Sequence, residues 1–119
     1  MSIRPLFIGN WKMNKLRSDA LVYCEKFCEL LGSGAQLDAD IWLSVPLTCF
    51  DAVRDNIANY DGKNSGRLAV GVQNAHWLPS GAHTGEVSAE MLKDAGAKFA
   101  LLGHSERRQY YGEDDEHVA

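Results

Sequence analysis

Short apolar runs alternate along the chain with longer stretches whose apolar residues recur at helical spacing. The short runs end in polar residues or glycine, a pattern typical of buried β-strands. They lie at residues 6–10, 40–46, 68–74 and 97–103. The sequence therefore predicts four strands with a helix between each consecutive pair.

The helix boundaries follow from capping residues and from glycine. We expect the first helix to start at Ser18 as its N-cap and to run through Leu31, where a Gly-Ser-Gly sequence should stop it. A second helix should start near Thr48 as its cap and run through Ile57, and a third should cover residues 86–95. Strands joined by helices imply right-handed βαβ crossovers and a parallel sheet. The pattern alone permits either a flavodoxin-like open sheet or part of a (β/α)8 barrel.

The composition is that of an ordinary soluble α/β domain. The 119 residues are 45% hydrophobic and 24% charged, which predicts a single domain over residues 1–119. The formal net charge of −4 argues against non-specific binding to nucleic acid or to an anionic membrane. No run approaches the ~20 apolar residues of a membrane span, and no signal-peptide pattern opens the chain, so we expect cytoplasmic residence.

Two other features have ordinary structural interpretations. The acidic residues 113–116 should open a helix, because carboxylates are favoured at a helix N-terminus. Cys24, Cys28 and Cys49 form an odd set without a Cys-x-x-Cys motif, so we interpret them as buried free thiols and expect no metal site.

Polar residues that could take part in catalysis or ligand binding follow the first and the fourth predicted strands. Asn10 and Lys12 come after the first strand, and His104 and Glu106 come after the fourth. In parallel α/β proteins, ligands and catalytic groups gather at the carboxyl ends of the strands. Each residue alone has an ordinary explanation, such as a turn, a solvated cation or an ion pair, but their joint placement indicates a site.

Four motifs in order give the chain a resemblance to the triosephosphate isomerase family, over the N-terminal half of that barrel. Residues 7–14 read FIGNWKMN, Gln73 and Asn74 end the third strand, residues 81–88 read GAHTGEVS, and residues 103–113 read GHSERRQYYGE. The resemblance covers almost the whole chain and favours the barrel over the open sheet. The fold expected is half of a TIM (β/α)8 barrel, with about four parallel strands and flanking helices.

The resemblance implies an isomerase that interconverts dihydroxyacetone phosphate and glyceraldehyde 3-phosphate, in glycolysis and gluconeogenesis, without a cofactor or metal. By that resemblance Asn10 would hydrogen-bond the substrate oxygens, and Lys12 would supply positive charge to the phosphate and the developing oxyanion. His104 would be the neutral electrophile that polarises the carbonyl, and Glu106 would be a supporting acid near Lys12. Thr84 would lie at the tip of a loop that reaches a neighbouring subunit.

The resemblance also implies parts that these residues do not supply. In the family the general base is a glutamate at the sixth strand, followed by a lid loop, and glycine-rich turns after the last two strands hold the phosphate. Barrels of this kind need about 250 residues. We therefore expect little or no isomerase activity from the 119 residues alone. The alternatives are an inert, self-associating half-barrel module and an N-terminal fragment that works with a separate C-terminal half.

Half a barrel should leave apolar surface and strand edges exposed, so we expect a homo-oligomer, either dimer or tetramer. The contacts should involve the strand edges, the inner sheet face and the loop around Thr84. A small phosphorylated ligand or anion is a further expected partner, while nucleic acid and membrane are not. Side-chain alternation places one set of residues on the barrel-lining face: Leu6, Ile8, Asn10, Ala100, Leu102 and His104. It places Phe99 and Leu101 on the outer face.

Overall fold

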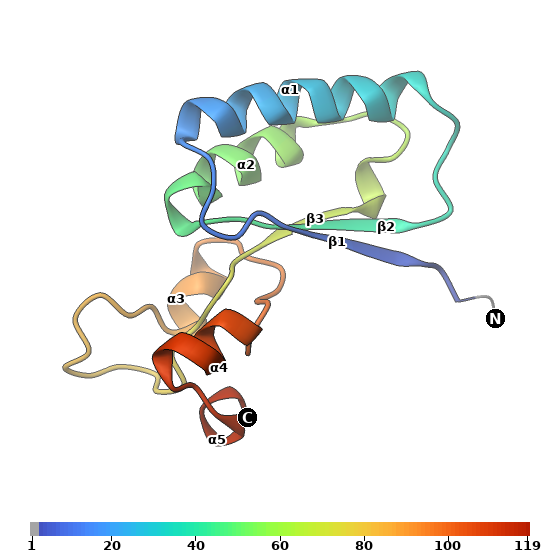
Figure 1. Ribbon diagram of the computed structural model, residues 1–119. Coiled ribbons are helices and arrows are strands. Elements are labelled where there is room, and N and C mark those ends of the chain that lie inside the picture. Colours follow the sequence, from blue (N-terminus) through green and yellow to red (C-terminus); the bar gives the residue numbers. More distant parts are fainter. Residues whose placement is uncertain (1–2) are drawn as a thin grey trace.

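The computed structural model describes residues 3–119, which form an open parallel sheet with α1 and α2 on one face (Figure 1). The elements, in chain order, are β1 (Leu6–Asn10), α1 (Arg17–Ser33), β2 (Asp40–Ser44), α2 (Leu47–Asn59), a 3-10 helix (Ser65–Arg67), β3 (Leu68–Gly71), α3 (Ala89–Asp94), α4 (Ser105–Tyr111) and α5 (Asp115–Val118). The alternation of strands and helices expected from the sequence is therefore confirmed as far as α3.

The sheet has three strands in the order β1-β2-β3, and both pairs are parallel. The expected fourth strand is reduced to one parallel bridge, between Val72 and Ala100. Three backbone hydrogen bonds nevertheless tie this segment to the end of β3: Lys98 N to Val70 O at 3.0 Å, Val72 N to Phe99 O at 3.1 Å, and Leu101 N to Val72 O at 2.9 Å. The segment runs parallel to β3, as expected, but within residues 3–119 it does not extend the ladder into a fourth strand.

The first two helices start at other residues than expected. Ser18 lies inside the first turn of α1, because the carboxylate of Asp19 accepts a hydrogen bond from the N–H of Leu16 at 2.9 Å. That acidic side chain satisfies an N–H at the helix start, as in a capping box. α2 begins directly after Pro46, so Thr48 is within the helix and does not cap it.

The short helices α3 and α5 are capped by side chains. α3 begins later than expected, where the Ser88 hydroxyl accepts a hydrogen bond from the N–H of Met91 at 3.3 Å. Asp114 caps α5 by accepting from the N–H of His117 at 3.1 Å. The acidic run therefore opens a helix, as expected.

The core lies between the sheet and the two long helices (Figure 1). Its buried members come mainly from β2, α2 and the end of β3: Leu43, Val45, Cys49, Phe50, Val53, Val70 and Val72. α1 contributes Ala20 and Cys24, and the loop after β1 contributes Trp11. Burial of these apolar side chains supplies the main driving force for folding. None of the helices within residues 3–119 combines the length and apolarity that a membrane span requires.

Within residues 3–119, α1 and α2 cover one face of the sheet (Figure 1), and apolar residues of β1 on the opposite face are exposed. Leu6 and Ile8 in β1 are 44% and 41% exposed. Side-chain alternation predicted Phe99 on the outer face and Ala100 on the barrel-lining face, and both predictions are wrong. The Phe99 ring stacks on Trp42 with centroids 4.9 Å apart, and Trp42 pairs with Ile8. Phe99 therefore lies on the barrel-lining face.

The same correction applies to Ala100, which pairs with the core residue Val72 and so faces the helix side. The expected placement counted back from His104 in steps of two. Gly103 has a left-handed φ of 67°. Strand alternation does not continue through such a residue, so the count reversed the two faces.

Candidate functional site

The four residues predicted as a site come together beyond the carboxyl ends of the strands. Asn10 ends β1, Lys12 lies two residues further, and His104 and Glu106 open α4. Lys12 has a left-handed backbone, with φ of 55°. That conformation costs a residue with a Cβ roughly 1–2 kcal/mol, so other contacts must hold it.

Asn10 is at the centre of the cluster, and its amide has a fixed orientation. The Oδ1 atom accepts from the backbone N–H of Lys12 at 2.9 Å and from Nε2 of Gln73 at 3.3 Å. Because both neighbours are donors, the oxygen must face them. The Nδ2 group therefore faces His104, whose Nδ1 lies 3.2 Å away.

The hydrogen bonds of His104 assign its tautomer. Nδ1 faces the amide donor of Asn10, so it is an acceptor without a proton. Nε2 lies 2.8 Å from the backbone oxygen of Leu101, which only accepts, so Nε2 carries the proton. The ring is thus a neutral imidazole with Nε2–H. Protonating Nδ1 would put two donors against each other.

Lys12 and Glu106 form the charged part of the cluster. The ammonium donates to Oε1 of Glu106 at 2.7 Å, and the hydroxyl of Ser105 donates to the same oxygen at 3.2 Å. The hydrogen bond from Lys12 is the main cause that lowers the pKa of the Glu106 carboxyl below its ordinary value. Both side chains are largely exposed, so the pair contributes little to stability. Its consequence is positional, because it holds the ammonium over the start of α4.

Gln73 is a member of the cluster that the sequence analysis did not assign to the site. Its Nε2 group contacts Asn10, the backbone oxygen of Lys12 at 2.9 Å and that of Ser44 at 3.4 Å. The available signal was its position just after the third strand, in one of the four motifs. No local pattern indicates that its side chain reaches back to the loop after β1.

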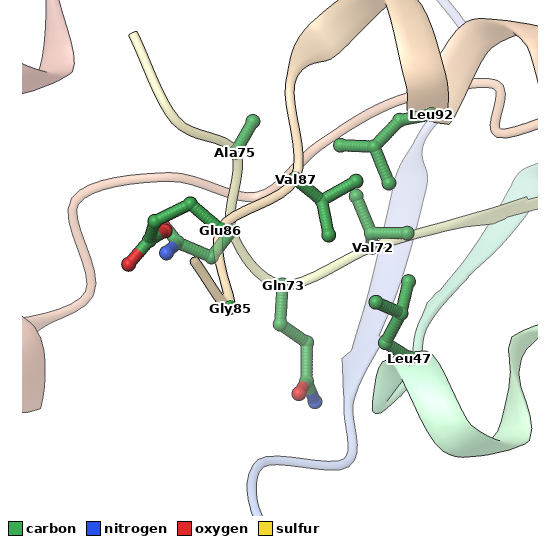
Figure 2. A pocket seen from close by; sticks show the side chains of 9 residues that line it. Leu47, Val72, Gln73, Ala75, Gly85, Glu86, Val87 and Leu92 are labelled. Carbon is green, nitrogen blue, oxygen red and sulfur yellow. The ribbon is translucent and has the colours of Figure 1, made fainter. Parts of the chain in front are cut away.

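A cavity of about 200 Å³ lies beside the cluster and shares only Gln73 with its members. In Figure 2, Val72, Val87 and Leu92 point toward one another, while the amide of Gln73 points away from them. The apolar side of this cavity joins the core. The polar groups of the cluster therefore lie outside this cavity, on the side of Gln73 toward which its amide points.

The three cysteines are free, as expected, but only Cys24 and Cys49 are buried, while Cys28 is partly exposed. Cys24 is fully buried, and burial is the largest cause that raises its pKa to about 11. Burial also raises the pKa of Cys28. Both thiols are therefore poor nucleophiles at neutral pH. Within residues 3–119, no group of three or more His, Cys, Asp or Glu side chains is placed to hold a metal ion.

The loop that carries Thr84 borders a second, larger cavity of about 460 Å³, whose lining also includes residues of α4 and α5. Aromatic rings stack across this region, with His76 between Trp77 and His83 at 4.1 and 4.5 Å. Trp77 in turn lies 4.4 Å from the ring of His117. The loop is thereby packed against the helices that follow His104.

The open parallel sheet, with its polar cluster beyond the strand ends, defines the chain as half of a TIM barrel. A crystal structure of triosephosphate isomerase from Bartonella henselae superposes with a TM-score of 0.80 at 33% identity, covering 97% of this chain and 44% of that one. A family model described as triosephosphate isomerase matches residues 5–119. The chain belongs to the triosephosphate isomerase family.

Curated relatives agree with this assignment. The chain is 39% identical to the triosephosphate isomerase of Gloeobacter violaceus over 97% of its own length, and 40% identical to that of Synechocystis sp. over 93%. It spans 44% and 43% of the lengths of these two proteins. The similarity therefore concerns less than half of each relative.

Proposed function

We propose that these residues supply the electrophilic part of a triosephosphate isomerase site, for interconversion of dihydroxyacetone phosphate and glyceraldehyde 3-phosphate. The observation that carries the proposal is the linked cluster of Asn10, Lys12, His104 and Glu106. The proposal includes the family's setting in glycolysis and gluconeogenesis in the cytoplasm.

The chemistry of the cluster fits a reaction that develops negative charge on a carbonyl oxygen. The Nε2–H of His104, once turned from Leu101 to a ligand, is a neutral donor to such an oxygen. The Asn10 amide is a second donor, and the Lys12 ammonium would attract a phosphate. Glu106 keeps that ammonium near the other donors. Together these groups stabilise an enediolate without a cofactor.

Proton abstraction needs a base, and the resemblance assigns it to a glutamate beyond the region that this chain matches. General-base catalysis is typically worth 10²–10⁴ in rate. We therefore expect the 119-residue polypeptide alone to show little or no isomerase activity. Addition of the remaining part of a relative should restore turnover.

A coupled isomerase assay tests this proposal. The 119-residue polypeptide would be assayed alone and with a polypeptide containing the rest of the Gloeobacter violaceus enzyme. We expect turnover only in the mixture, and loss of it with Lys12→Met but not with the exposed control Lys26→Met. Activity of the mixture that Lys12→Met leaves unchanged would refute the assigned role. Turnover of the polypeptide alone near that of a full-length relative would refute the need for a second part.

A second candidate, a self-associating half-barrel, is favoured by the exposed barrel-lining face. Leu6 and Ile8 are each more than 40% exposed, and β1 is an edge strand of the sheet. Such surfaces favour association with another sheet or another copy. We expect a dimer or tetramer that uses these edges, this face and the loop around Thr84.

The mass in solution tests the second candidate. Light scattering of the polypeptide at micromolar concentration should give a dimer or tetramer, and Ile8→Lys should lower the mass while Lys26→Glu should not. A monomer with cooperative unfolding would exclude self-association.

A further inference from the structure

We infer that Gln73 is the positioning residue of the cluster, holding the loop after β1 in the one conformation that joins Lys12, Asn10 and His104. Its function in turnover rests on the proposed isomerase activity, but its effect on geometry does not. The inference starts from the strained backbone of Lys12, whose φ of 55° is unusual for a residue with a side chain.

Both backbone polar groups of Lys12 are held by side chains of this cluster. Its N–H donates to Oδ1 of Asn10 at 2.9 Å, and its carbonyl oxygen accepts from Nε2 of Gln73 at 2.9 Å. Gln73 comes from the end of β3, 61 positions further along the chain. A left-handed residue persists only where its surroundings determine it, and here the two amides do so.

The same amide group orients Asn10. Nε2 of Gln73 has two protons and three acceptors within reach, so its weaker contacts are shared. It lies 3.3 Å from Oδ1 of Asn10 and 3.4 Å from the backbone oxygen of Ser44. The Ser44 residue is fully buried, which gives Gln73 a rigid anchor at the end of β2.

The consequence extends to the histidine. With Oδ1 of Asn10 held by Gln73 and by the Lys12 N–H, its Nδ2 group must face Nδ1 of His104. If the loop after β1 relaxes, both donors leave Oδ1 and the Asn10 amide can turn over. Its oxygen would then face Nδ1, and two acceptors do not pair. Gln73 thus keeps the Asn10 donor against Nδ1 of His104 without touching the ring, while the Leu101 oxygen holds the proton on Nε2.

Gln73→Met tests this, because methionine has a similar length and no donor. Gln36→Met is the matched control, since Gln36 is exposed and remote in a loop. We expect amide hydrogen exchange at Lys12 to rise about tenfold or more in Gln73→Met. In the control it should stay within error of the wild type. A rise in Gln73→Met that does not exceed the control's overturns the inference.

The ring nitrogens of His104 give a second readout that a general loss of stability would not move. Nitrogen-15 NMR should find Nδ1 hydrogen-bonded in the wild type and the control, and shifted toward the signal of an imine nitrogen without a hydrogen bond in Gln73→Met. An Nδ1 signal in that variant unchanged from the wild type overturns the orienting role.

If Gln73→Met unfolds, as judged by exchange at the core amides of Leu43 and Val45, Gln73→Asn replaces it. Asparagine keeps the amide but is one methylene too short for all three acceptors. It should give the same two changes, and their absence in a folded Gln73→Asn protein overturns the inference. Neither measurement uses isomerase activity, so a failed assay and a failed positioning role are distinguishable.

Discussion

Gly71 lies at the end of β3, where the segment with Phe99 runs alongside that strand. A Cβ built on Gly71 would collide with the backbone oxygen of Phe99 and would lie 2.6 Å from Cδ1 of its ring. The backbone of Gly71 is not left-handed, so an alanine is conformationally allowed there. The collision is with a backbone atom, which no side-chain rotation can relieve. Gly71→Ala must therefore displace the segment.

The cost follows from the contacts that hold this segment. Displacement would break the three backbone hydrogen bonds to β3, at about 1 kcal/mol each, and the stack of Phe99 on Trp42, at about 1 kcal/mol. Complete detachment would thus cost about 4 kcal/mol, and partial relaxation about 1–3 kcal/mol, as is typical of overpacking. His104 follows the segment directly, so the cluster with Asn10 would be lost as well.

Urea unfolding followed by circular dichroism measures the loss in stability, and the nitrogen-15 signals of His104 report the cluster. Gly66→Ala is the matched control, because a Cβ at Gly66 would meet nothing within 4 Å. The control should be neutral or more stable by up to about 1 kcal/mol. A Gly71→Ala protein within about 0.5 kcal/mol of the wild type would refute the reasoning, since the segment would then not depend on its close approach to β3.

Three further predictions concern single side chains. Because the pKa of Cys24 is raised to about 11, alkylation at pH 7.5 in the folded protein, followed by mass spectrometry, should modify the less buried Cys28 first, and equal rates at both would contradict the burial argument. The lowered pKa of Glu106 means that its pairing stabilises the fold above the unfolded pKa of about 4.3 and is lost as pH falls through the folded value. Lys12→Met should therefore raise the titration midpoint of Glu106 in carbon-13 NMR, and an unchanged midpoint would exclude Lys12 as the cause. Ser88→Ala should cost about 1 kcal/mol in urea unfolding through the lost cap of α3, and a loss under about 0.3 kcal/mol would show that the cap is dispensable.

Local patterns predicted the succession of elements well. The strand at 6–10 matches β1, and the acidic run opens α5 with Asp114 as its cap. The errors arose where more than one nearby side chain could cap the same helix. Ser18 was a reasonable cap by type, but the carboxylate of Asp19 accepts from the N–H of Leu16, and the N-cap lies two residues earlier, at Leu16.

The sequence by itself determined the family, the order of strands and helices, and which polar residues follow which strand. These properties depend on neighbours in the chain and on motifs, so they can be read without coordinates. Only the tertiary structure decided that Phe99 lies on the barrel-lining face, because a left-handed Gly103 breaks the alternation used for counting. It also decided the tautomer of His104 and the place of Gln73. Those depend on the hydrogen bonds of Asn10 with His104, which is 94 positions away, and with Gln73, which is 63 positions away. No local pattern contains such contacts.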